Sequence, residues 1–199
     1  MNLALFDFDG TITTREMLPD FFRLAIPSHR LFIGKILLAP LIIGYKRGII
    51  PGTLVRAAIV RMGFSGVPYS HYELKGREFA ANVIPGVVRA EVIERIRWHK
   101  TKGDLVVVVS GALDIYLCHW CNHHGVELIC SSLEHRNGVL TGRYRGKQCV
   151  RSEKAELVAA RFNIASFAEV FAYGDTVEDR ELLALASRKF YQGREVSEI

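Results

Sequence analysis

The chain has 199 residues, of which 49% are hydrophobic, which is enough for one sizeable core with an inserted subdomain. Its formal net charge of +5 at pH 7 favours anionic partners, and no nucleic-acid partner is expected. Four cysteines in a chain of this length, with no signal pattern at the N-terminus, argue against a secreted disulfide framework and favour a reducing, cytoplasmic compartment.

The first part of the chain predicts one strand followed by helices. Residues 3–8 form an apolar run typical of a short buried strand. No confident strand follows before residue 85, so residues 15–84 are interpreted as a helical insertion after that strand. The expected helical stretches are 15–25, two short pieces within 31–48, then 53–62 and 69–82.

The apolar stretch 31–48 is unusual in its surroundings. It is about as apolar as a membrane span, but it is too short, and Lys35 and Pro40 interrupt it. No acidic residue occurs between Asp20 and Glu73, while seven basic residues do: Arg23, Arg30, Lys35, Lys46, Arg47, Arg56 and Arg61. Two interpretations remain open: residues 31–45 pack inside the insertion, or they lie against an anionic bilayer surface.

The rest of the chain alternates between strand and helix patterns, which predicts an α/β fold with an open, doubly wound parallel sheet. Residues 105–111 are a continuous β-branched run, as expected of a strand buried on both faces. Ser152 is expected to cap a helix whose apolar stripe is Ala155, Val158, Ala159 and Phe162. The other expected elements are helices 87–100, 113–124 and 179–186, strands 126–132, 169–175 and 189–192, and a hairpin around Asn137-Gly138.

A cluster of cysteine and histidine residues lies in the expected helix 113–124. Cys118, Cys121 and the neighbouring His119, His123 and His124 could suggest zinc, but no second ligand pair follows at finger spacing. Cys121 shares an apolar stripe with Leu117 and Trp120, so core packing is the preferred interpretation.

Polar residues follow three of the expected parallel strands. They are Asp7, Asp9, Gly10 and Thr11 after the first strand, Ser110 and Gly111 after the second, and Gly174, Asp175 and Asp179 after a later one. Ligands of such sheets bind outside the carboxyl ends of the strands, so these groups are expected to converge. Clustered carboxylates favour a hard divalent cation such as Mg²⁺, which in turn favours a phosphorylated substrate.

These motifs resemble those of the haloacid dehalogenase superfamily of phosphatases, in its phosphoserine-phosphatase-like branch. The matching residues are Asp7-Phe8-Asp9-Gly10-Thr11, Ser110, a lysine before the last motif strand, and the Gly174-Asp175 pair with Asp179. The resemblance implies a Rossmann-like core over 1–14 and 85–199 with a helical cap over 15–84.

The resemblance also implies roles for the motif residues. Asp7 would be the nucleophile, and Asp9 the acid and then the base. The Mg²⁺ ligands would be Asp7, the backbone carbonyl of Asp9, and Asp175, with Asp179 in support. Gly10, Thr11, Ser110 and Gly111 would contact the phosphoryl group.

The resemblance implies roles for a lysine and a glutamate as well. The catalytic lysine would be Lys154, with Lys147 as the alternative. Glu16, nine residues after Asp7, would contact the substrate, as an acidic residue does in phosphoserine phosphatases.

The long apolar, basic insertion resembles the layout of type C phosphatidylglycerophosphatases. It favours a membrane-lipid phosphate as substrate, with peripheral contact at the inner membrane face. The alternatives are a soluble phosphomonoester such as phosphoserine, and an inactive binding protein on the same fold.

Overall fold

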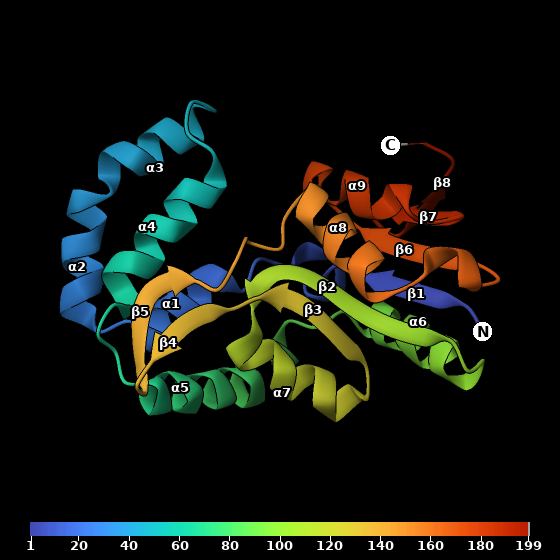
Figure 1. The fold of residues 1–199 in the computed structure, drawn as a ribbon, viewed down its shortest axis with the longest axis horizontal. Coiled ribbons are helices and arrows are strands. Elements are labelled where there is room, and N and C mark those ends of the chain that lie inside the picture. Colours follow the sequence, from blue (N-terminus) through green and yellow to red (C-terminus); the bar gives the residue numbers. More distant parts are fainter. Residues whose placement is uncertain (199) are drawn as a thin grey trace.

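The computed structural model describes residues 1–198 and contains a six-stranded sheet (Figure 1). Five strands are parallel, and the edge strand β8 pairs antiparallel with β7. In spatial order the strands are β3 (Glu127–Ser131), β2 (Leu105–Leu113), β1 (Leu3–Phe6), β6 (Val170–Gly174), β7 (Arg188–Tyr191) and β8 (Arg194–Val196). The predicted doubly wound α/β fold is confirmed, whereas β8, a short polar strand, was not predicted.

Helices cover both faces of the sheet (Figure 1). Leu3 and Leu5 of β1 pack on the side of α8 (Ser152–Arg161) and α9 (Arg180–Ala184). The alternate residues Ala4 and Phe6 belong to the core on the side of α6 (Ala90–Thr101) and α7 (Asp114–His124). Because both faces are buried, the central strands consist of continuous apolar runs rather than alternating ones.

The register brings three strand ends to one edge of the sheet. Phe6, the last residue of β1, pairs with Val108 of β2 and with Tyr173 of β6. The segments that follow these three residues in the chain therefore start side by side, as the sequence predicted.

Five α-helices lie between β1 and α6, and we refer to them together as the cap. They are α1 (Leu18–Ala25), α2 (Ser28–Leu37), α3 (Ala39–Lys46), α4 (Gly52–Phe64) and α5 (Tyr69–Asn82). The chain leaves and re-enters the core through a two-stranded neck. There the Thr14 N–H donates to the Val87 carbonyl and the Arg89 N–H donates to the Ile12 carbonyl, each at 2.9 Å.

The hairpin of β4 (Leu133–Arg136) and β5 (Val139–Tyr144) belongs to the second part of the chain but packs on the cap. The Gly66 N–H donates to the Leu140 carbonyl at 2.9 Å, and the Leu140 N–H donates to the Val67 carbonyl at 2.8 Å. Phe21 of α1 also packs against Tyr116 of α7, with ring centroids 4.9 Å apart. Cap and core therefore share one continuous apolar cluster.

Helices α2 and α3 contain no buried residue and lie at the outer end of the cap, farthest from the N-terminus (Figure 1). Their exposed side chains include Phe32, Ile36 and Leu37, at 67%, 61% and 65% exposure. Leu31 is partly buried against the core cluster, but most of residues 31–45 lie at the surface of the cap rather than inside it. Within residues 1–198 no single helix is long and apolar enough to cross a membrane. The pair α2 and α3 is long and apolar enough when taken together, but the two helices are bent by 60° at their junction.

Three helix predictions need correction. Residues 15–25 are helical only from Leu18, and helix α6 starts at Ala90 rather than residue 87, because the preceding residues form the neck. Ser152 is not a cap but the first residue of α8, which follows Arg151 at φ 52°. Ala159 is exposed, because α8 turns Lys154 and Val158 toward the sheet instead. By contrast, Cys121 is buried in the apolar core of α7, which confirms its predicted packing role.

Candidate active site

The candidate site is centred on Asp7, which follows β1 directly. Its N–H donates to the Tyr173 carbonyl at 2.9 Å, so the sheet pairing continues into the site. Its carboxylate is buried, and the Lys154 ammonium donates to Asp7 Oδ1 at 2.5 Å and to Asp179 Oδ1 at 2.6 Å. One buried cation thus bridges two buried carboxylates from opposite ends of the chain.

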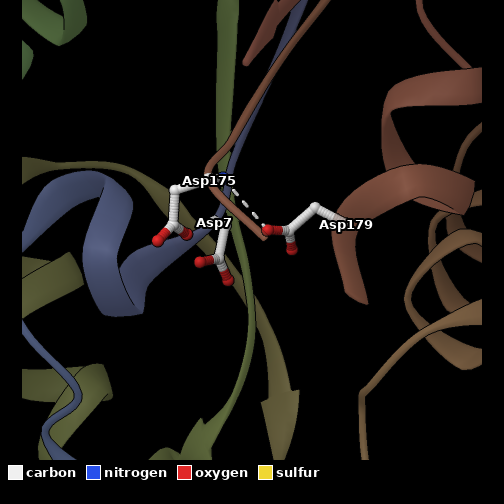
Figure 2. A group of neighbouring side chains, drawn as sticks. All are labelled: Asp7, Asp175 and Asp179. Carbon is white, nitrogen blue, oxygen red and sulfur yellow. Dashed lines mark hydrogen bonds between the residues drawn. The ribbon is translucent and has the colours of Figure 1, made fainter. Parts of the chain in front are cut away.

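Asp175 completes a cluster of three carboxylates with Asp7 and Asp179. Each offers an oxygen within 4.8 Å of the others, and Figure 2 shows the three side chains converging. The second oxygen of Asp179 accepts hydrogen bonds from the N–H groups of Asp175 and Thr176, at 3.2 and 3.1 Å. Both oxygens of Asp179 are therefore engaged, which gives it a supporting position behind the other two.

Two glycines allow the carboxylates to approach the backbone this closely. A Cβ atom on Gly10 would lie 2.1 Å from Asp175 Oδ2, and Gly10 has φ +81°, a conformation that other residues rarely adopt. A Cβ atom on Gly174 would lie 2.6 Å from the Cβ of Asp179. A side chain larger than hydrogen would therefore clash with Asp175 at Gly10 and with Asp179 at Gly174.

The predicted phosphate contacts surround this cluster. The Thr11 hydroxyl donates to Asp175 Oδ1 at 3.2 Å, so it also orients a carboxylate. Ser110 and Gly111 were predicted to follow the second strand, but β2 continues to Leu113 and includes both; Ser110 is buried there, and its oxygen accepts a hydrogen bond from the Ala112 N–H at 3.1 Å. Gly111 follows, close to the loop of Cys149 and Val150 that leads into α8.

The carboxylate of Asp9 is not part of the cluster. One of its oxygens accepts a hydrogen bond from the Met17 N–H at 3.0 Å, at the start of the cap. The tight turn over residues 8–12 separates its direction from that of Asp7, although an extended segment would have placed both on one side. Asp9 is thus tied to the start of the cap, two residues after Asp7.

Burial dominates the electrostatics of the site. It raises the pKa of Asp7 well above the ordinary carboxyl value, and it raises the pKa of Asp9 to about 7. It also raises the pKa of Asp175, and the nearby Asp179 adds to that effect. Burial alone would lower the pKa of Lys154, but the Asp7 and Asp179 carboxylates outweigh it and raise this pKa.

The donor set fits a hard divalent cation. Lys154 is a single positive charge among three carboxylates, and burial raises the pKa of Asp7 and of Asp175 although Lys154 lowers both, which is the burial cost that a further cation would offset. Oxygen ligands from carboxylates are those that Mg²⁺ takes in proteins. The residues that could hold it are Asp7 and Asp175, with Asp179 oriented behind them.

Two other predicted residues lie outside the cluster. Lys147 is exposed and pairs with Glu153 and Glu156 at 2.8 and 3.5 Å, so the structure places Lys154, not Lys147, beside Asp7. Glu16 is exposed at the cap side, where its charge contributes to the raised pKa of Asp9.

The sequence did not single out Arg56, which reaches the site from helix α4 of the cap. Its guanidinium pairs with Glu178 at 3.2 Å, and its Nη1 lies 3.4 Å from the position that a Gly111 Cβ would occupy. Arg56 was only one of seven basic residues in the acid-free stretch, and nothing in its spacing distinguished it. Gln148 forms a second cap contact, donating to the Thr53 carbonyl at 2.8 Å.

Comparisons with known proteins agree with this architecture. The family model of the haloacid dehalogenase-like hydrolases matches residues 4–184, so the chain belongs to that family. Protein CicA of Caulobacter vibrioides is 29% identical over 196 residues, which cover 96% of this chain and 85% of CicA.

Solved structures share the fold. A protein of unknown function from Bordetella pertussis Tohama I has a TM-score of 0.76 at 23% identity, covering 94% of this chain and 88% of its own. A phosphoserine phosphatase captured as a phospho-aspartyl intermediate analogue has a TM-score of 0.67 at 22% identity, covering 94% and 84%. The predicted superfamily and its phosphoserine-phosphatase-like architecture are confirmed.

Proposed function

We propose that the protein is a Mg²⁺-dependent phosphatase that hydrolyses a phosphomonoester through an aspartyl-phosphate on Asp7. The observation that carries this proposal is the position of the Asp7 carboxylate. It lies at the end of the central strand, is held by Lys154, and shares a cluster with Asp175 that fits a divalent cation. Membership of a hydrolase family supports the same reaction class.

In the first step, a carboxylate oxygen of Asp7 forms a bond to phosphorus while the bond from phosphorus to the leaving oxygen breaks. Asp9, when protonated, gives its proton to that oxygen, so the alcohol leaves neutral. Lys154 keeps Asp7 oriented and places a positive charge beside the negative charge that develops there. Mg²⁺ bound by Asp7, the Asp9 carbonyl and Asp175 would stabilise charge on the phosphoryl oxygens.

In the second step, Asp9 takes a proton from a water molecule whose oxygen attacks the phosphorus. The bond between phosphorus and Asp7 breaks, which releases inorganic phosphate and restores the carboxylate. The pKa of Asp9, raised by burial to about 7, suits a group that must both give and accept a proton near neutral pH.

For the substrate we propose a membrane-lipid phosphate such as phosphatidylglycerophosphate, reached from the cytoplasmic face of the membrane. Support comes from α2 and α3, whose exposed Phe32, Ile36 and Leu37 stand beside basic residues such as Lys35 and Lys46 in an acid-free stretch. Exposed apolar side chains with flanking cations are what a helix at an anionic bilayer surface needs.

A substrate screen tests the catalytic proposal. Phosphate release is measured from lipid phosphates in detergent and from soluble phosphomonoesters, including phosphoserine, with and without Mg²⁺. Asp7→Asn should abolish release, and the control Asp20→Asn, a surface residue paired with Arg15 and Arg23, should not. Unchanged release by Asp7→Asn would contradict the mechanism. A higher kcat/KM for a soluble substrate would contradict only the lipid assignment.

Vesicle binding tests the membrane proposal. Wild type should co-sediment with phosphatidylglycerol vesicles at low salt. A variant with Lys35, Lys46 and Arg47 changed to Gln should bind roughly 100-fold more weakly, because each basic residue near such a surface contributes about 1 kcal/mol. The matched control changes three exposed basic residues of the core to Gln: Arg97, Lys102 and Arg194. Equal binding by both triple variants would refute docking through the cap.

A further inference from the structure

The cap contains a groove that the proposed reaction does not use. It has a volume of about 190 Å³ and lies between α1, α2, α3 and α4. Apolar side chains form most of its wall: Phe22, Ile26, Leu31, Ile42, Ile59 and Met62. We refer to it as the cap groove.

The charges at the cap groove lie at its margin rather than inside it. Arg30 turns its guanidinium away to the carbonyls of Gly63 and Ser65, at 3.2 and 2.8 Å, and so closes the end of α4. Arg23 and Lys35 are exposed residues of the lining, and the charge of Arg23 is paired with Asp20. The groove is therefore an apolar channel with the cationic side chain of Lys35 at its rim.

Gly34 of α2 and Met62 of α4 both line the cap groove. A Cβ atom on Gly34 would lie 2.9 Å from the terminal methyl of Met62, so the bare position lets Met62 pack against α2. Glycine inside a helix costs stability relative to alanine. A large side chain at residue 34 would displace Met62 and narrow the groove.

The surroundings of the cap groove identify its occupant. Helix α2, which lines the groove with Leu31 and Gly34, also carries exposed Phe32, Ile33 and Leu37, so exposed apolar side chains stand on the same helix as the groove wall. A second copy of this chain would bring another acid-free, basic cap against the first, and like charges oppose that contact. A ligand with an apolar chain and an anionic head would pack its chain against the apolar wall and place its head beside the cationic rim.

We propose that the cap groove binds one acyl chain of an anionic lipid. This deepens the lipid part of the proposed function and rests on it. Phe22 of α1 and Ile26, which directly follows α1, line the groove, and the residue before α1, Met17, donates its N–H to Asp9 at 3.0 Å. A chain in the groove therefore packs on the helix whose preceding residue holds the proposed acid.

Laurate is a suitable probe, because it has an acyl chain and an anionic head but no phosphate to hydrolyse. Its binding to the full-length protein is measured by calorimetry below the critical micelle concentration. Gly34→Leu fills the groove from α2, and Gly86→Leu makes the same change where a Cβ atom meets open space. Circular dichroism checks that both variants are folded.

We expect wild type and Gly86→Leu to bind laurate equally and Gly34→Leu to bind at least 10-fold more weakly. Ile42→Asn, which places an amide in the groove wall without adding bulk, should weaken binding in the same direction. Absence of laurate binding by wild type, or equal binding by all four proteins, would overturn the proposal. Because laurate is not hydrolysed, its binding is measured independently of the phosphatase activity, so a failure of either proposal is recognised separately.

Discussion

Gly10→Ala tests whether the proposed metal site depends on the close packing of Asp175 on the backbone. The new Cβ atom would lie 2.1 Å from Asp175 Oδ2 and 2.7 Å from its carboxyl carbon. Since ordinary contacts begin near 3.4 Å, the carboxylate has to retreat by about 1 Å. A shift of about 1 Å at a reacting centre can cost on the order of 100-fold in rate.

The backbone contributes a second, separable penalty. Gly10 has φ +81°, and a residue with a Cβ atom pays roughly 1–2 kcal/mol for that conformation. Gly103→Ala is the matched control, because Gly103 has φ +73° but a Cβ atom there meets open space. Both variants should lose similar stability in urea unfolding, and only Gly10→Ala should lose activity.

The assay is phosphate release as a function of Mg²⁺ concentration. Gly10→Ala should lower kcat by about 100-fold and raise the Mg²⁺ concentration for half-maximal activity by roughly 10-fold or more. If Gly10→Ala stays within about threefold of Gly103→Ala in both quantities, the role assigned to Asp175 is refuted.

Three further predictions concern buried or cap residues. Lys154→Met removes the cation that two buried carboxylates share, so it should abolish activity and lower the free energy of unfolding by about 3–5 kcal/mol in urea titrations; a stable, active variant would contradict its placement. Arg56→Gln should lower kcat/KM roughly 10- to 100-fold, whereas the exposed Arg61→Gln on the same helix should not; equal effects would exclude a substrate contact by Arg56. Burial lowers the pKa of His99, so below about pH 6.5 the unfolded chain binds a proton that the folded protein does not. The free energy of unfolding should therefore fall with decreasing pH, by at most about 1.4 kcal/mol per unit from this group, and urea unfolding of His99→Gln should show a flatter slope.

Much of the site could be predicted because its residues follow the strands directly. Asp7 and Asp175 are each the first residue after a buried parallel strand, and the register of such strands brings their ends together. The apolar run that predicts each strand also predicts where the strand ends, so the sequence was sufficient to place Asp7 and Asp175 in one site.

Contacts across the cap could not be predicted in this way. Arg56 reaches the site from α4 of the cap, where its guanidinium pairs with Glu178, and no periodicity in the sequence marks that direction. The orientation of α8 was also missed: Ser152 looked like a cap, and the apolar stripe was expected to include Ala159. The ion pairs of Lys154 instead require that residue to face the sheet. Composition alone left residues 31–45 equally compatible with a buried or an exposed position.

Identification of the phosphorylated residue tests the central claim most directly. The protein is mixed with a hydrolysable phosphomonoester and Mg²⁺, quenched in acid on the millisecond timescale, digested, and examined by mass spectrometry. The mechanism predicts one phosphoryl group on the peptide that contains Asp7, lost in Asp7→Asn. Phosphate release with no phosphorylated protein, or with the group on another residue, would contradict it.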